Sequence, residues 1–173
     1  MPKILKADPV ILALDLGANL GYCARTDMQI VVHGVYNLND PKDPQPAWRF
    51  INLNTFLTDL YKRLEPRCIE RVYYEAPHMR GWPATFSLIG LAATVESWAI
   101  RHGIPRPTRV HTATIKKHIT GNGKADKNEV MTAVKKRFPG LAIIDDNNAD
   151  AVALSCYAVD TKGKEEDEET SDD

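Results

Sequence analysis

One apolar segment organises the chain: Val10-Ile11-Leu12-Ala13-Leu14-Asp15-Leu16-Gly17-Ala18-Asn19-Leu20-Gly21-Tyr22. Six of the seven residues from 10 to 16 are apolar, which predicts a strand buried on both faces. Asp15 interrupts the run, and a carboxylate there is costly to ionise unless another group pairs with it. Gly17 and Gly21 follow, and glycines permit sharp turns and close approach to a ligand. The segment therefore indicates a metal or phosphate site at a strand end, or a structural aspartate that caps the turn.

The composition predicts a globular protein of one domain. The chain has 173 residues, of which 43% are hydrophobic. No apolar run approaches the ~20 residues that span a bilayer, and the N-terminus lacks the features of a signal peptide. Three widely spaced cysteines, Cys23, Cys68 and Cys156, argue against a disulfide framework or a zinc cluster. We therefore expect a cytoplasmic protein with no membrane partner.

Charge divides the chain into a body and a tail. The net charge is -1, and the segment 162–173 contains seven acidic residues and two lysines. The body therefore has a mild positive charge, which is compatible with a polyanionic partner. We predict one domain over 1–161 and a disordered acidic tail over 162–173, which competes with nucleic acid for the basic surface or only improves solubility.

Hydrophobic periodicity and turn residues predict an α/β fold. The expected elements are strands at 10–16, 21–25 and 29–36, a helix at 47–64, a strand at 69–77, a helix at 83–102, a short strand at 107–110, and helices at 112–119, 127–138 and 147–159. Thr112 and Asp126 are the expected N-caps of two of these helices. This order predicts a mixed five-stranded sheet with helices on both faces, and ligands gather at the carboxyl ends of such strands.

Three carboxylates are hard to explain as surface residues. Asp15 lies in a buried strand, Glu75 ends another, and Asp150 lies in the first turn of an otherwise apolar helix. Helix capping, worth about 1 kcal/mol, accounts for Asp145 or Asp146 more easily than for Asp150. Carboxylates from separate elements repel one another unless a cation neutralises them, and hard oxygen ligands select magnesium or manganese. Two such ions about 4 Å apart can cleave a phosphodiester.

A basic loop lies between the last strand and the last helix. Two glycines, Gly121 and Gly123, are surrounded by the lysines Lys116, Lys117, Lys124 and Lys127. The loop indicates either a phosphate cradle or an ordinary solvated basic surface.

Four motifs together resemble the RuvC family of Holliday junction resolvases over about residues 10–159. They are Leu14-Asp15-Leu16-Gly17 with Gly21, Tyr74-Glu75, Gly121-Asn122-Gly123-Lys124-Ala125-Asp126-Lys127, and Asn148-Ala149-Asp150-Ala151. The short chain and the run Asp145-Asp146-Asn147-Asn148-Ala149-Asp150-Ala151 look more like the bacteriophage branch. The resemblance implies a ribonuclease H-like fold and a homodimer. It also implies a magnesium-dependent endonuclease of DNA recombination and repair, which makes paired symmetric nicks at four-way junctions and leaves 5′-phosphate and 3′-hydroxyl ends.

The resemblance also assigns residues. Asp15, Glu75 and Asp150 match family ligands for two Mg²⁺ ions, with Mn²⁺ as a substitute. The bacterial family has an acidic residue or histidine where this chain has Asn147, so the fourth ligand is Asn147 or the neighbouring Asp146. We favour Asp146, because a carboxylate binds a hard cation better than an amide does. Two lysines, Lys116 and Lys127, match basic residues that the family uses near the scissile phosphate.

The segment after Glu75 matches the place where the family inserts residues at the junction centre. Met79, Arg80 and Trp82 are the candidates, because apolar side chains that wedge between bases unstack them. The apolar members of this segment could instead cap the following helix.

Two other functions remain open. A catalytically silent module of the same fold would bind branched DNA without cutting it, and the departure at Asn147 is compatible with this. An actin-like or sugar-kinase-like phosphotransferase also begins with an Asp-X-Gly strand, but it needs two such domains. Flaps, forks and replication intermediates are alternative substrates to four-way junctions.

Overall fold

The computed structural model describes residues 8–43, 45–78 and 81–169, the last seven of these by backbone alone. Its five strands form one mixed sheet in the order β3-β2-β1-β4-β5. They are β1 (Val10–Asp15), β2 (Asn19–Arg25), β3 (Ile30–Asn37), β4 (Ile69–Glu75) and β5 (Thr108–Val110). The first three strands pair antiparallel, whereas β4 runs parallel to both β1 and β5. The predicted α/β fold with a mixed five-stranded sheet is confirmed.

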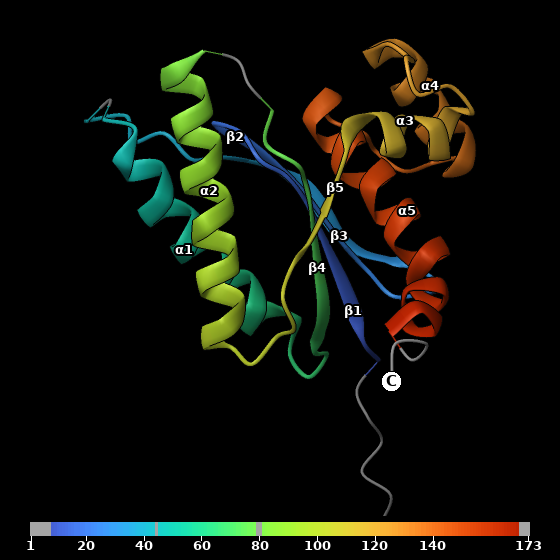
Figure 1. The fold of residues 1–173 in the computed structure, drawn as a ribbon, viewed down its shortest axis with the longest axis horizontal. Helices are drawn as coiled ribbons and strands as arrows, with labels where there is room; N and C mark the ends of the chain where they lie inside the picture. The colour runs from blue at the N-terminus through green and yellow to red at the C-terminus, as the bar shows by residue number, and fades with distance from the viewer. Residues whose placement is uncertain (1–7, 44, 79–80, 170–173) are drawn as a thin grey trace, which may run out of the picture.

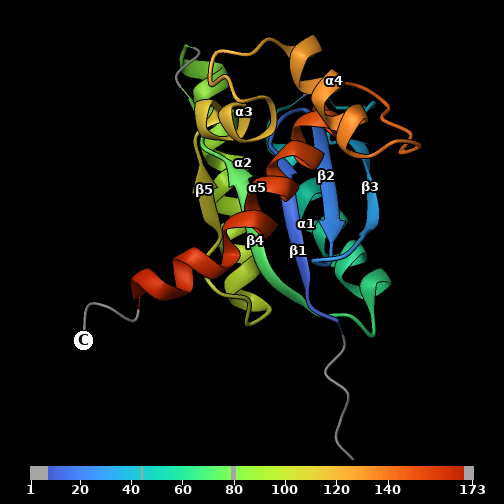
Figure 2. The ribbon, with the colours of Figure 1, turned by 90° about the vertical axis from the view of Figure 1, so that its right-hand side faces the viewer.

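Helices cover both faces of this sheet (Figure 1). One face carries α1 (Ala47–Leu64) and α2 (Trp82–Arg101), and the other carries α3 (Thr112–Thr120), α4 (Lys127–Arg137) and α5 (Asp146–Glu169). Figure 2 shows α5 lying across the sheet, with α3 and α4 on its outer side. Within the described residues, no helix combines the length and the apolar character that a membrane crossing requires.

The alternating side chains of β1 contribute to two separate cores. Leu12 and Leu14 pack with buried residues of α1 and α2, including Trp98. Ile11 and Ala13 point to the opposite face and pack with buried residues of α3, α4 and α5. All four of these β1 side chains are at most 2% exposed. Because both faces are covered, the strand reads as a continuous apolar run, and Asp15 at its end is the exception.

The last helix is longer than predicted. It was expected to end at residue 159 but runs to Glu169, so residues 162–169 of the expected disordered tail are helical. Lys162 explains part of this extension, because its ammonium group lies 2.5 Å from the carboxylate of Glu70 on β4. Lysine and glutamate are also good helix formers. The remaining tail residues, 170–173, lie outside the described residues.

The two short helices begin differently from one another. Asp126 caps α4 as predicted: its side chain accepts from the backbone N–H of Glu129, whose side chain accepts from the N–H of Asp126. The prediction for α3 was wrong, because the N-cap is His111 and Thr112 is already helical. The hydroxyl of Thr112 is therefore free to bond elsewhere.

Gly21 lets the last helix approach the sheet. It lies opposite Asp15 in the pairing of β1 with β2. A Cβ at this position would overlap the backbone carbonyl group of Asn147, in the first turn of α5. The glycine is therefore needed for close packing of backbone on backbone rather than for a turn.

We expect Gly21→Ala to lower the free energy of unfolding by roughly 2 kcal/mol or more, because neither strand nor helix can move without disturbing a packed core. Gly17→Ala is the matched control, since its added Cβ would lie 3.5 Å from the nearest atom, an ordinary contact. Urea unfolding followed by circular dichroism measures both variants. Equal midpoints for the two variants would contradict this account of Gly21.

Candidate active site

Three carboxylates from three elements line one cavity. Asp15 ends β1 and Glu75 ends β4, and these neighbouring strands are parallel, so their carboxyl ends meet at one edge of the sheet. Asp150 projects from the first turns of α5, which packs against β1. All three side chains line a cavity of about 330 Å³. The fold therefore gathers the carboxylates that the sequence singled out.

Burial and mutual repulsion both disfavour the ionised form of the carboxylates in this cavity. Burial raises the pKa of Asp15 well above its usual range, and the charges of Glu75 and Asp150 raise it further. Burial, and then the charge of Glu75, raises the pKa of Asp150 to about 6. A divalent cation would relieve both effects, so the donor set suits a hard ion such as Mg²⁺. Across the described residues, no three His, Cys, Asp or Glu side chains are already drawn together as a formed metal site.

Glu75 is oriented by a residue that the sequence analysis assigned to another role. The hydroxyl of Thr112, in the first turn of α3, donates a hydrogen bond to Oε1 of Glu75. His78 Nδ1 lies 3.9 Å from the same oxygen. Hydrogen bonds of this kind fix the direction of a carboxylate that is to bind a cation. Thr112 was identified from the sequence only as a helix cap, which hid this contact.

The start of α5 is fixed by a capping residue and a buried amide. Asp145 accepts from the backbone N–H of Asn148 at 2.9 Å, so capping does explain this acidic residue. The Asn148 side chain is fully buried, accepts from the backbone N–H of Ile144 and donates to the carbonyl of Gly34 on β3. It lies 3.1 Å from His33 Nδ1. These bonds set the position of Asp150 two residues further on.

The two candidates for a fourth ligand lie in different places. Asn147 lines the cavity together with the three carboxylates. Asp146 forms an ion pair with Lys127, whose hydrogen bond lowers the pKa of Asp146 and raises that of Lys127. Asp146 remains close enough for its charge to raise the pKa of both Asp15 and Asp150.

Only some of the predicted DNA-binding residues lie at the cavity. Lys116 and Lys127 line it, and Lys116 donates to the carbonyl of Ala125 at 2.7 Å, which ties α3 to the basic loop. Lys117 lines a separate surface hollow beside Tyr157, and Lys124 is exposed in the loop.

The expected junction-centre residues are only partly described. Met79 and Arg80 lie outside the described residues. Trp82 is the first residue of α2, is 76% exposed, and contacts the ring of Phe86 with centroids 6.1 Å apart.

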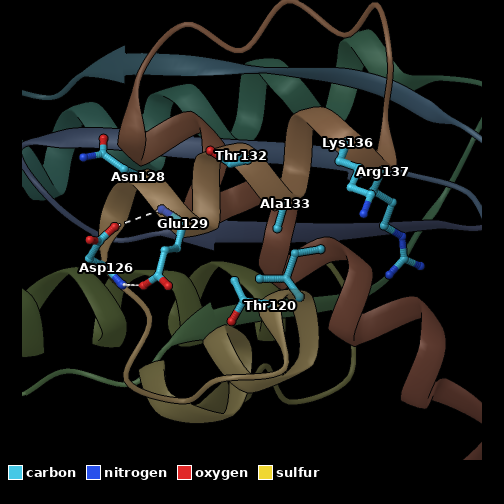
Figure 3. Close-up of a pocket in the computed structure, with 9 residues that line it drawn as sticks. Thr120, Asp126, Asn128, Glu129, Thr132, Ala133, Lys136 and Arg137 are labelled. Carbon is cyan, nitrogen blue, oxygen red and sulfur yellow. Dashed lines mark hydrogen bonds between the residues drawn. The ribbon is translucent and has the colours of Figure 1, made fainter.

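A larger hollow of about 740 Å³ lies beside α3 and α4 (Figure 3). Its acidic residues, Asp126 and Glu129, bond to each other's backbone in the capping box, as the dashed lines show. Both carboxylates already accept hydrogen bonds from backbone N–H groups at the start of α4. The smaller cavity is therefore the better candidate for the active site.

Sequence reasoning also missed Arg49 and Ser87, which line the cavity from α1 and α2. The periodic pattern of both helices describes only their apolar faces, and an isolated arginine or serine gives no periodic signal. Their approach to the carboxylates depends on how the helices pack against the end of the sheet.

No protein-family model and no curated protein sequence matches the chain. Solved structures do match. The chain is similar to Thermus thermophilus RuvC in complex with a Holliday junction substrate, with a TM-score of 0.69, 21% sequence identity, and 84% of this chain and 90% of that chain covered. It is also similar to a second structure of Thermus thermophilus RuvC, with a TM-score of 0.70, 20% identity, and 90% and 96% covered. The predicted resemblance is therefore confirmed at the level of the fold, which is the ribonuclease H-like fold of RuvC.

Proposed function

We propose that this protein is a structure-selective, metal-dependent endodeoxyribonuclease that resolves four-way DNA junctions. Other branched DNAs are further candidate substrates. The products would be paired symmetric nicks with 5′-phosphate and 3′-hydroxyl ends. One observation supports this most strongly: Asp15, Glu75 and Asp150 meet in one cavity with two lysines, on the fold of RuvC. The RuvC structure solved with a Holliday junction favours this function over a phosphotransferase.

Each residue of the cavity has a proposed role. Asp15, Glu75 and Asp150 would hold two Mg²⁺ ions, or Mn²⁺ in their place, and either Asn147 or Asp146 would complete the set. When bound, such ions activate a water molecule and stabilise the leaving oxygen. Thr112 would keep Glu75 in its binding orientation, because it already donates to that carboxylate. Lys116 and Lys127 would bind the phosphate backbone next to the cut.

Lys127 pairs with Asp146 and partly offsets the acidic charge at the cavity. With cations and DNA present, the same ammonium group would be available to a phosphate oxygen. Asp146 would then be free to bind a cation, which keeps it in the proposed ligand set beside Asn147.

We also propose a homodimer, in which two cavities cut two strands. The support is an apolar stripe on the outer side of α2, where Trp82, Phe86, Ile89 and Ile100 are each more than half exposed. Their spacing of four, three and eleven residues puts them on one side of the helix. Exposed apolar stripes of this kind mark interfaces, and two identical stripes can pair across a two-fold axis.

Two outcomes would favour the alternatives. A protein that binds junctions tightly without cutting them would be a silent module of the same fold. A protein that cuts flaps or forks faster than four-way junctions would have another branched DNA as its substrate.

We expect Asp15→Asn to reduce junction cleavage in Mg²⁺ by at least ~100-fold while junction binding is retained, because a cation ligand is lost and the basic surface is not. The assay uses a labelled immobile four-way junction beside its linear duplex. Asp145→Asn is the matched control: it removes a nearby charge that does not line the cavity, and asparagine caps a helix as well as aspartate. Near-normal turnover by Asp15→Asn would overturn the proposed site.

The pH dependence of the free energy of unfolding tests the raised pKa of Asp150. The folded protein holds the pKa of Asp150 at about 6, above its ordinary value of 3.8, so folding favours the protonated form. This contribution is fully present below pH 4 and is lost as the pH rises through 6. In EDTA, Asp150→Asn should therefore gain on the wild type between pH 4.5 and 7.5, by on the order of 2 kcal/mol. Denaturant unfolding at both pH values measures this, and a gap independent of pH would contradict the raised pKa of Asp150.

The dimer is tested by a charge on the apolar stripe. Ile89→Glu should shift the protein from dimer to monomer in sedimentation velocity, because a carboxylate would be buried at the interface. Met28→Glu is the control, since Met28 is 91% exposed in the turn between β2 and β3. A wild type that is already monomeric, or a dimeric Ile89→Glu, would exclude α2 as the interface.

A further inference from the structure

A further basic side chain lines the cavity, and the proposed mechanism gives it no role. Arg49 lies in the first turn of α1 and lines the cavity with the carboxylates. It comes from the face of the sheet that α1 and α2 cover, whereas Lys116 and Lys127 come from the helices on the opposite face (Figure 1). The carboxylates at the ends of β1 and β4 therefore lie between positive charges from two sides.

Arg49 is held in place by neutral groups. Its Nε donates to Oδ1 of Asn39 at 2.8 Å, and its Nη1 donates to the hydroxyl of Ser87 at 3.3 Å. Ser87 is only 8% exposed, so this anchor is part of the packed boundary between α1 and α2. Within the described part of the chain, the acceptors offered to this guanidinium carry no charge.

Arg49 and Lys127 differ in the charge of the side chains that bond to them, and this difference affects their capacity to bind a phosphate. Lys127 is neutralised by Asp146, whereas the partners of Arg49 among the described residues are the neutral side chains of Asn39 and Ser87. Two of its five N–H groups are used by Asn39 and Ser87, and no other acceptor for them is found in residues 8–43, 45–78 and 81–169. A planar guanidinium with free donors and an uncompensated charge suits the two oxygens of a phosphate.

We propose that Arg49 binds a backbone phosphate of the DNA strand that enters the cavity, on the opposite side of the carboxylates from Lys116 and Lys127. This deepens the proposed nuclease function and depends on it. A strand bound by Arg49 on one side and by Lys116 and Lys127 on the other would lie across the carboxylates in one orientation. Arg49 would thus contribute to substrate binding and to alignment for the cut, with Asn39 and Ser87 as its positioning residues.

The first test is the salt dependence of junction binding, measured in EDTA so that no strand is cut. Arg49→Met should bind about tenfold more weakly, with a slope of log affinity against log salt that is less steep by about 0.9, the value for one lost phosphate contact. Arg49→Lys should keep the slope and recover part of the affinity, because it retains the charge but not the paired donors.

Arg63→Met is the matched control. It removes the same charge from the other end of α1, which is about 21 Å away along the helix axis. Its binding and salt slope should equal those of the wild type. Single methylphosphonate substitutions along the junction add a readout that a purely structural role would not move: the one that removes the contacted charge should weaken the wild type and leave Arg49→Met unaffected.

The outcomes separate the two proposals. If the wild type cuts junctions and Arg49→Met matches Arg63→Met in affinity and slope, the assignment of Arg49 is wrong and the nuclease function stands. If the wild type neither binds nor cuts branched DNA, the proposed function fails, and Arg49 has no strand to hold.

Discussion

The burial of Asp15 and Asp150 beside Glu75 in one cavity is the constraint on which the rest of the structure depends. Burial is the larger cost of ionising Asp15 and Asp150, and the negative charge of Glu75 adds to it. The raised pKa values of Asp15 and Asp150 express this cost. A fold that lines one cavity with three carboxylates must hold them there through interactions elsewhere.

Those interactions are visible at each element that contributes a carboxylate. The parallel pairing of β1 with β4 fixes the first two side chains at one edge of the sheet. Gly21 allows α5 to approach that edge, and the buried amide of Asn148 ties the start of α5 to β3. Thr112 of α3 then orients Glu75 by donating a hydrogen bond to its carboxylate. These contacts therefore hold the acidic groups in one cavity despite their repulsion, which is typical of a site that binds a cation.

Much of the fold could be predicted because its signals are local. The apolar run of β1 and the periodic pattern of α1 gave their positions, and α1 has the predicted bounds, Ala47–Leu64. The carboxylates could also be found, because a charged residue in a buried strand or apolar helix is a local anomaly. Their convergence followed from the rule that parallel strands end at the same edge.

The remaining features depend on contacts between distant segments. Thr112 has the sequence signature of a cap, and only the position of Glu75 in the fold reveals its actual partner. Arg49 lies in a helix whose pattern describes only its buried side. The acidic composition after residue 161 predicted disorder, whereas helix propensity and the contact of Lys162 with Glu70 favour the observed helix. Composition describes an isolated segment and omits the surface against which it packs.

We propose above all that this cavity binds divalent cations, and anomalous scattering from crystals soaked in Mn²⁺ tests this most directly. We expect manganese peaks bonded to Asp15, Glu75 and Asp150, and the same map would identify Asn147 or Asp146 as the fourth ligand. The peaks should disappear in crystals of Asp15→Asn. Manganese bound only elsewhere on the protein, or none in this cavity at millimolar concentration, would contradict the claim.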